Sequence, residues 1–270
     1  MNNKKLGLIF DFLLIIILTL LTQIGGLLYL LVIWLWRKKQ WKYRKLKMFM
    51  LFLLLYLTTT FVVVPFLAPL FGREKIQDTA TLQSHLFLTK LLNRDYVRPE
   101  LHQVLQKISK DFDSLHPGIK TIYLDANFPF WNGFPLLPHL SHHDGKKIDL
   151  ALIYKTPDGK LTNEKKSRSG YGVFVEPREN EIKQYLICKQ KGYGQYDYPK
   201  YLTFGRTNKN LKFSPEGTRD LIQCILKQKE IGKIFIEPHL KQRMNLTDKR
   251  IRFHGCRAVR HDDHIHIQLE

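Results

Sequence analysis

Two long apolar runs near the N-terminus constrain this chain more than any other feature. Leu6 to Trp36 is almost continuously apolar, and Leu46 to Phe71 is a second such run with two prolines near its end. Each run exceeds the ~20 residues that a helix needs to cross a bilayer. A cleavable signal peptide is the alternative for the first run, but its apolar region is too long and lacks a small-residue cleavage site. The sequence therefore predicts a two-helix transmembrane hairpin within residues 1–71.

The segment between the two runs predicts the orientation of this hairpin. Arg37 to Lys47 holds seven positive charges and no acidic residue. The positive-inside rule places such a short loop in the cytoplasm. We therefore expect a two-pass protein of the inner (cytoplasmic) membrane, with the lipid bilayer as a partner. Both chain ends and the soluble part would then lie on the periplasmic or extracellular side.

The chain is strongly basic, with a formal net charge of +19. Residues 1–71 hold nine Lys or Arg and one acid (+8), and the remaining residues hold 34 and 23 (+11). A basic exported domain suits an anionic wall polymer or a lipid surface, and charge alone would equally suit nucleic acid. A charge run beside a membrane helix is, however, typical of a topology signal and a lipid contact. No nucleic acid is therefore expected as a partner.

Beyond the hairpin, residues 72–97 are predicted to be a tether and residues 98–270 a soluble domain. A helix is expected from Pro99, because six apolar residues recur at helical spacing before Pro117. A second helix is expected over Ser214 to Lys229. Short apolar runs between them predict strands, so the expected fold class is α+β: a small antiparallel sheet with flanking helices.

The last residues carry a histidine pattern on a predicted strand. His261, His264 and His266 form H-x-x-H-x-H, and the residues from 264 onward alternate polar and apolar. On a strand, His264 and His266 would share one face, while Ile265 and Ile267 would lie against the core. Two imidazoles side by side suit a metal ligand next to a general base. An exposed histidine strand, or histidines satisfied in a core, is the alternative.

A second histidine motif lies upstream, before the apolar run 148–154. His139, His142 and Asp149 form H-x-x-H with an aspartate seven residues later, and Gly145 permits a sharp turn between them. Two histidines and one carboxylate leave a fourth zinc position open for water, as in catalytic sites. The alternative is a polar loop before a strand.

Together the two motifs resemble those of the penicillin-insensitive murein endopeptidases. These belong to the group of lysostaphin-type, D-Ala-D-Ala metallopeptidase and hedgehog-type domains. The resemblance spans roughly residues 99–270, with a divergent middle, and includes the strand Lys233 to Pro238. The matching motif residues are His139, Ser141, His142, Gly145, Asp149, His261, His264 and His266.

The resemblance implies a Zn²⁺ cofactor held by His142, Asp149 and His266. His264 would act as general base, and His261 would orient it or stabilise an oxyanion. His139 would be a further ligand or a catalytic-site support for His142. The implied enzyme is a membrane-anchored zinc metallopeptidase that hydrolyses amide bonds in peptidoglycan cross-link peptides.

Three other functions stay open. A D-amino-acid carboxypeptidase of the same fold would need a cation for the free carboxylate, such as Arg252, Arg257 or Arg260. A metal phosphohydrolase would use H-D pairs, which occur at 143–144 and 261–262, but such enzymes place these ligands on helices. A non-catalytic cell-wall-binding module would keep a structural zinc.

The middle of the domain is the least readable part. Strands are expected at Gly172 to Glu176 and Gln184 to Lys189, followed by a tyrosine- and glycine-rich loop that could bind sugar or peptide, or be a solvated hairpin insertion. Glu237 and His239 are expected in a surface turn, with a place behind the metal site or the binding of a second metal as the alternatives. Three cysteines permit one disulfide and one free thiol in an oxidising compartment.

Overall fold

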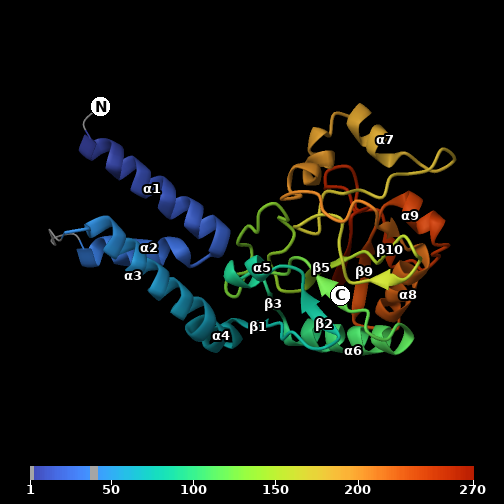
Figure 1. The fold of residues 1–270 in the computed structure, drawn as a ribbon, viewed down its shortest axis with the longest axis horizontal. Coiled ribbons are helices and arrows are strands. Elements are labelled where there is room, and N and C mark those ends of the chain that lie inside the picture. The colour runs from blue at the N-terminus through green and yellow to red at the C-terminus, as the bar shows by residue number, and fades with distance from the viewer. Residues whose placement is uncertain (1–2, 37–41) are drawn as a thin grey trace.

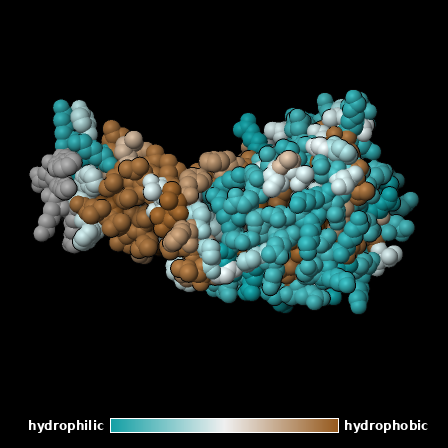
Figure 2. Space-filling view, turned by 90° about the horizontal axis from the view of Figure 1, so that it is seen from below, coloured by the Kyte–Doolittle hydropathy of each residue, from teal (hydrophilic) through white to brown (hydrophobic). Residues whose placement is uncertain are grey.

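A computed structural model describes residues 3–36 and 42–270, which form an apolar helical region and a globular part (Figure 1). The helical region is mostly hydrophobic over its visible surface, except at the end away from the globular part, whereas the globular part is mostly hydrophilic (Figure 2). The basic segment expected to set the orientation falls partly on residues 37–41, which lie outside the described residues. Two helical stretches, Lys5–Thr22 and Arg44–Phe71, are long and apolar enough to cross a membrane.

The first apolar run forms two helices rather than the single one predicted. α1 (Asn3–Thr22) ends at Gln23, whose φ of 68° turns the chain, and α2 (Gly25–Trp36) runs back along it. A Cβ at Gly26 would lie 1.9 Å from the Thr19 hydroxyl, so this tight return requires glycine. The start of α1 and the end of α2 therefore lie at the same end of the helical region, away from the globular part (Figure 1).

The second apolar run returns to the globular part as one stack of helical segments. These segments are α3 (Arg44–Thr58), η1 (Thr59–Val63), α4 (Val64–Leu67) and η2 (Ala68–Phe71). The expected pair of long apolar helices is thus present, with α2 inserted between them.

The globular part is built on a six-stranded sheet. Its order is β10 (Ile251–Arg252), β9 (Ile231–Phe235), β11 (His264–Leu269), β5 (Lys147–Ala151), β4 (Thr121–Tyr123) and β2 (Leu82–Ser84). The four central strands pair antiparallel, as predicted, but both edge strands pair in parallel, so the sheet is mixed. A three-stranded sheet joins β7 (Leu161–Thr162), β6 (Tyr154–Lys155) and β8 (Lys212–Phe213).

One face of the large sheet packs on two helices. The predicted helix at Pro99 is α6 (Pro99–Leu115), and α8 (Pro215–Leu226) begins where Ser214 caps the backbone N–H of Gly217. Their apolar side chains share one buried cluster with Ile265 and Ile267 of β11. This cluster is the main hydrophobic core, and it leaves the opposite face of β5 and β11 free for polar side chains. A further helix, α9 (Pro238–Arg243), follows β9.

Residues 72–97, predicted as a tether, belong to the folded part. They form β1 (Glu74–Lys75), β2, α5 (Phe87–Leu91) and β3 (Tyr96–Val97). The side chains of Ile76 and Leu82 are buried in the main core. These apolar side chains explain why the segment folds onto the domain instead of remaining extended.

The helical region is hydrogen-bonded to the globular part. The backbone N–H of Phe130 donates to the Gln23 side chain over 3.1 Å, and the Tyr56 hydroxyl donates to the Leu91 carbonyl over 2.6 Å. The Asn93 side-chain amide lies 3.4 Å from the Thr60 hydroxyl. The turn after α1 is therefore fixed beside the loop around Phe130, and the α3–η1 stretch is fixed beside the end of α5.

Candidate metal centre

The pairing of β5 with β11 brings the two motifs together. In their antiparallel register His266 lies opposite Asp149, and His264 lies opposite Ala151. Residues directly opposite on neighbouring strands point to the same face, so His264, His266 and Asp149 share the face away from the core. The predicted assignment of strand faces is confirmed, because Ile265 and Ile267 are fully buried in the core.

A turn places the remaining histidines over this face. Gly145 adopts a φ of +77°, as predicted for the sharp turn, and its N–H donates to the Asn127 side chain. His142 Nδ1 lies 2.7 Å from the Ala126 carbonyl oxygen. A carbonyl only accepts, so Nδ1 carries a proton, and Nε2 is the nitrogen that faces the strands.

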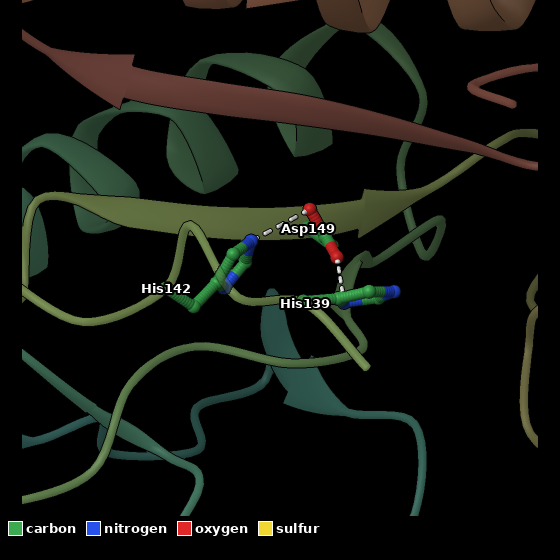
Figure 3. A group of neighbouring side chains, drawn as sticks. All are labelled: His139, His142 and Asp149. Carbon is green, nitrogen blue, oxygen red and sulfur yellow. Dashed lines mark ion pairs between the residues drawn. The ribbon is translucent and has the colours of Figure 1, made fainter. Parts of the chain in front are cut away.

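Asp149 is the centre of the site (Figure 3). His139 Nδ1 lies 2.8 Å from its Oδ2, and His142 Nε2 lies 3.3 Å from its Oδ1. His266 Nδ1 lies 2.9 Å from the same Oδ1, and His264 Nε2 lies 3.8 Å from it. One buried carboxylate therefore has four imidazoles around it, all from residues that the sequence singled out.

The electrostatics of the cluster depend on burial and on this carboxylate. Burial opposes ionisation of Asp149, but the neighbouring histidines hold its pKa well below the usual range. Burial lowers the pKa of His266 to about 3, so its imidazole is neutral at physiological pH. For His264 burial acts in the same direction, but Asp149 and Asp263 outweigh it and raise the pKa to about 9. Burial and the adjacent histidines lower the pKa of His261 well below its usual value.

The donor set can hold a metal ion. One ligand atom from each of His139, His142 and Asp149 lies within 4.8 Å of the other two, and all three residues are buried. Neutral imidazoles with one carboxylate are ligands that zinc accepts. His266 Nε2 is buried and has no hydrogen-bond partner within residues 3–36 and 42–270. This group contains two of the predicted ligands, His142 and Asp149, together with His139, which was predicted as a further ligand or support. The third predicted ligand, His266, lies outside the group but beside it, with Nδ1 2.9 Å from Asp149 Oδ1.

Two residues that hydrogen-bond to the site were not among the predicted site residues. The Tyr171 hydroxyl donates to Asp149 Oδ2 over 2.8 Å, and Asp263 Oδ1 lies 2.5 Å from His264 Nδ1. Asp263 lies within the H-x-x-H-x-H motif, directly before His264, and could have been found there. Tyr171 lies in the segment 156–201 that periodicity did not resolve, so only the fold reveals it.

Glu237 and His239 are buried, so the expected surface turn is wrong. Glu237 accepts hydrogen bonds from the Tyr196 hydroxyl over 2.6 Å and from the His261 backbone N–H over 3.1 Å. The proline that follows the strand starts α9 and leaves Glu237 facing inward. Glu237 therefore positions the backbone of the last motif.

Arg260 is held in a buried network. It pairs with Asp262, with Glu176 and with Asp197, and its guanidinium lies 3.8 Å from the centre of the Phe174 ring. Because its guanidinium is already paired with these carboxylates, Arg260 is not available to bind the carboxylate of a substrate.

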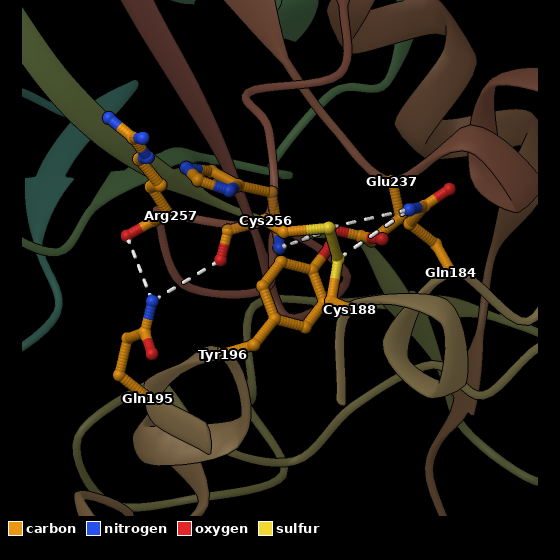
Figure 4. Close-up of a disulfide and its surroundings, with 8 residues drawn as sticks. Gln184, Cys188, Gln195, Tyr196, Glu237, Cys256 and Arg257 are labelled. Atoms are coloured by element: carbon orange, nitrogen blue, oxygen red, sulfur yellow. Dashed lines mark hydrogen bonds between the residues drawn. A yellow bond between two sulfur atoms is a disulfide. The ribbon is translucent and has the colours of Figure 1, made fainter. Parts of the chain in front are cut away.

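The middle segment differs from the prediction. Gly172 to Glu176 is irregular, and the second expected strand is helix α7 (Gln184–Gln190), followed by the 3₁₀ turns of η3 (Gly194–Tyr201). A disulfide between Cys188 and Cys256 ties α7 to the loop before the last motif (Figure 4). The Gln195 side chain donates to the backbone carbonyl of Arg257 nearby. Cys224 is buried and free.

The cluster lies in a cavity of about 970 Å³. His139, His142, Asp149, His261, His264 and His266 line one part of it. The η3 segment contributes Gln195 and Tyr198, so the tyrosine-rich loop lies at the cavity rather than in a solvated hairpin. The loop that precedes His139, residues 127–138, is rich in aromatic side chains and contributes Leu137 and Pro138 to the cavity. This volume lies at the upper end of the ~300–1,000 Å³ typical of ligand sites.

No family model matches the sequence, and no curated protein matches it either. The resemblance to murein endopeptidases therefore stays a prediction based on the motif residues. What the fold adds is that these residues, separated by more than a hundred positions, converge on one buried carboxylate.

Proposed function

We propose that this chain is a membrane-anchored, zinc-dependent hydrolase of amide bonds, with peptidoglycan cross-link peptides as its substrate class. The observation that carries the proposal is the buried carboxylate of Asp149, surrounded by four histidines in a cavity large enough for a peptide. A structural zinc site would more often use cysteine, but Cys188 and Cys256 are paired with each other and Cys224 lies in the core.

His142, Asp149 and His266 would hold the ion, with His139 as a fourth candidate ligand. When bound, zinc supplies Lewis-acid polarisation of a carbonyl and an acidified water. Asp149 is oriented for this role by the Tyr171 hydroxyl. Such a supporting hydrogen bond fixes a ligand's direction and tunes its basicity.

His264 is the proposed proton carrier. Its Nδ1 is held by Asp263, so Nε2 is the nitrogen that faces Asp149 and the cavity. The pKa of about 9 reflects the uncompensated negative charge of Asp149. With that charge shared by a bound cation, Nε2 would lose its proton and could then accept one from water and return it to the leaving amine. His261, whose ring centre lies 4.8 Å from that of His264, lines the cavity beside it.

The location of the site supports an extracytoplasmic substrate. Two helical stretches are apolar enough to span a membrane, and the disulfide beside the cavity is typical of an oxidising compartment. We propose that the globular part lies on the outer side of the cytoplasmic membrane, where it could reach the wall polymer.

The full chain, purified in detergent with zinc, tests the proposal with cross-linked muropeptides and mass spectrometry. Chelator-sensitive conversion of dimers to monomers is expected, and the variant His264→Gln should retain zinc but lose hydrolysis. One zinc per chain without any cleavage would contradict the hydrolase and support the wall-binding module.

A carboxypeptidase is the second candidate, favoured by one observation. Arg257 is exposed and lines the cavity, whereas Arg260 is fully paired. Arg257 is therefore the cation that could bind a terminal carboxylate. Loss of only a terminal D-alanine in the same assay, abolished by Arg257→Ala, would identify this activity.

A further inference from the structure

The cavity extends from the histidines to the membrane helices. Leu21, in the last turn of α1, lines the same cavity as His264 and His266. Leu88 of α5 and the neighbouring Leu92 line it between these two ends. Since α1 is one of the two helices apolar enough to span a membrane, one end of the cavity lies beside the proposed bilayer.

Many of the side chains that line the cavity are large and apolar. Besides the leucines from α1 and α5, the cavity is lined by Leu137, Leu140, Leu202 and Phe204. Large apolar side chains at the surface of a soluble domain are usually scattered, yet Leu88, Leu137, Leu140 and Phe204 are all at least 39% exposed around this one cavity. A continuous apolar surface of this kind marks an interaction with an apolar partner.

We propose that the substrate of this site carries a long hydrocarbon chain embedded in the membrane, and that the chain lies in this cavity. The chain would enter past Leu21 and Leu88, while the head of the molecule presents its amide to the histidines. This inference rests on the proposed function for the reaction, in which the C–N bond breaks. Water then supplies a hydroxyl to the carbonyl carbon and a proton to the nitrogen. It makes lipid-linked amides the preferred substrates within the proposed class.

A pair of substrates tests this specificity. The full chain in lipid nanodiscs is given the same peptide amide with and without a hexadecyl chain, and kcat/KM is measured for both. We expect kcat/KM to be at least about tenfold higher for the chain-bearing substrate, because each buried methylene favours binding.

Cavity variants separate binding in the cavity from simple partition into the bilayer. Leu88→Ser and Phe204→Ser should each reduce kcat/KM several-fold for the chain-bearing substrate and leave that for the free peptide unchanged. Leu115→Ser is the matched control, because Leu115 is equally exposed on α6 but does not line the cavity. Equal kcat/KM for both substrates, or a preference that the cavity variants leave intact, would overturn the inference.

Photolabelling tests the chain site without hydrolysis. A hexadecyl amide with a diazirine on the chain is irradiated with the full chain in nanodiscs, and labelled peptides are mapped by mass spectrometry. Labels at residues 86–92 and 202–204 are expected, and Leu88→Ser should reduce them. Labels confined to the helical region would overturn the inference. Labels in the cavity, without hydrolysis of any amide, would support the binding of the hydrocarbon chain in the cavity but contradict the proposed hydrolase function.

Discussion

The two faces of the β5–β11 strand pair carry opposite chemistry. One face consists of Ile148, Ile265 and Ile267 in the main core, and the other presents Asp149 and the histidines to the cavity. The core face is stabilised by removing apolar surface from water, whereas the site face buries a carboxylate and imidazoles at a free-energy cost. Neighbouring residues on one strand therefore have different roles, one in packing the core and the next in forming the site. Substitutions on the core face should change stability, and substitutions on the site face should change function.

The largest effect is expected at the centre of the site face. Asp149→Asn keeps the side-chain shape but removes the charge that four histidines surround. Bound zinc should fall from one per chain to none, measured by elemental analysis, and hydrolysis should fall by more than about a thousandfold. Asp144→Asn is the control, because Asp144 pairs with Lys147 outside the cluster. Unchanged zinc content in Asp149→Asn would mean that the cluster does not bind the metal.

The next effect should separate metal binding from proton transfer on the same face. His264→Gln should lower kcat by about 10²–10⁴-fold, the usual contribution of a general acid or base, while zinc content stays at one per chain. Both are measured on the same preparation. A variant that loses its zinc would reassign His264 as a ligand.

On the opposite face, Ile267→Ala should act on stability alone. A fully buried isoleucine cut to alanine leaves a cavity, and the free energy of unfolding should fall by about 2–5 kcal/mol. Urea titration of the full chain in detergent measures this change, and zinc content should be unaffected. Leu115→Ala, on the exposed end of α6, should change it by less than about 0.5 kcal/mol. Loss of zinc in Ile267→Ala without loss of stability would show that the two faces are not independent.

The smallest effect concerns pH in the metal-free protein. The raised pKa of His264, about 9, gives stability that is complete below about pH 6.5, the unfolded value, and is lost as pH rises to 9. The lowered pKa of His266, about 3, gives the reverse: its contribution is complete above about pH 6.5 and is lost as pH falls toward 3. With a chelator present, the urea midpoint should therefore be highest near pH 6.5.

Variants assign the two limbs of this pH profile. His264→Gln should flatten the alkaline limb, and His266→Gln should weaken the acidic one. A midpoint that does not change between pH 6.5 and 9 would contradict the charge assigned to His264.

The strand faces were predictable because their signal is local. Alternation along residues 264–269 places His266 and Ile267 on opposite sides whatever else the chain does. The turn at Gly145 was predictable for the same reason, since the residue itself permits the required φ.

The remaining features depend on distant partners. Tyr171 reaches Asp149 only because the segment around it folds over the sheet. Gln184 to Gln190 is too short for its periodicity to distinguish strand from helix, and its Cys188 is fixed by a cysteine 68 residues away. Likewise, Gly25 and Gly26 are visible in the sequence, but uniform hydrophobicity on both sides hides the turn that they allow.

The turn at Gln23 also changes the side of a bilayer on which the N-terminus would lie relative to the globular part. With α2 folded back beside α1, the beginning of α1 points away from the globular part, toward the end where α2 stops (Figure 1). Tags at the two termini would then report opposite compartments, instead of the same one as in a simple hairpin. The basic residues near the starts of α1 and α3, which include Lys5, Arg44 and Lys45, would lie on the N-terminal side, where the positive-inside rule places such residues.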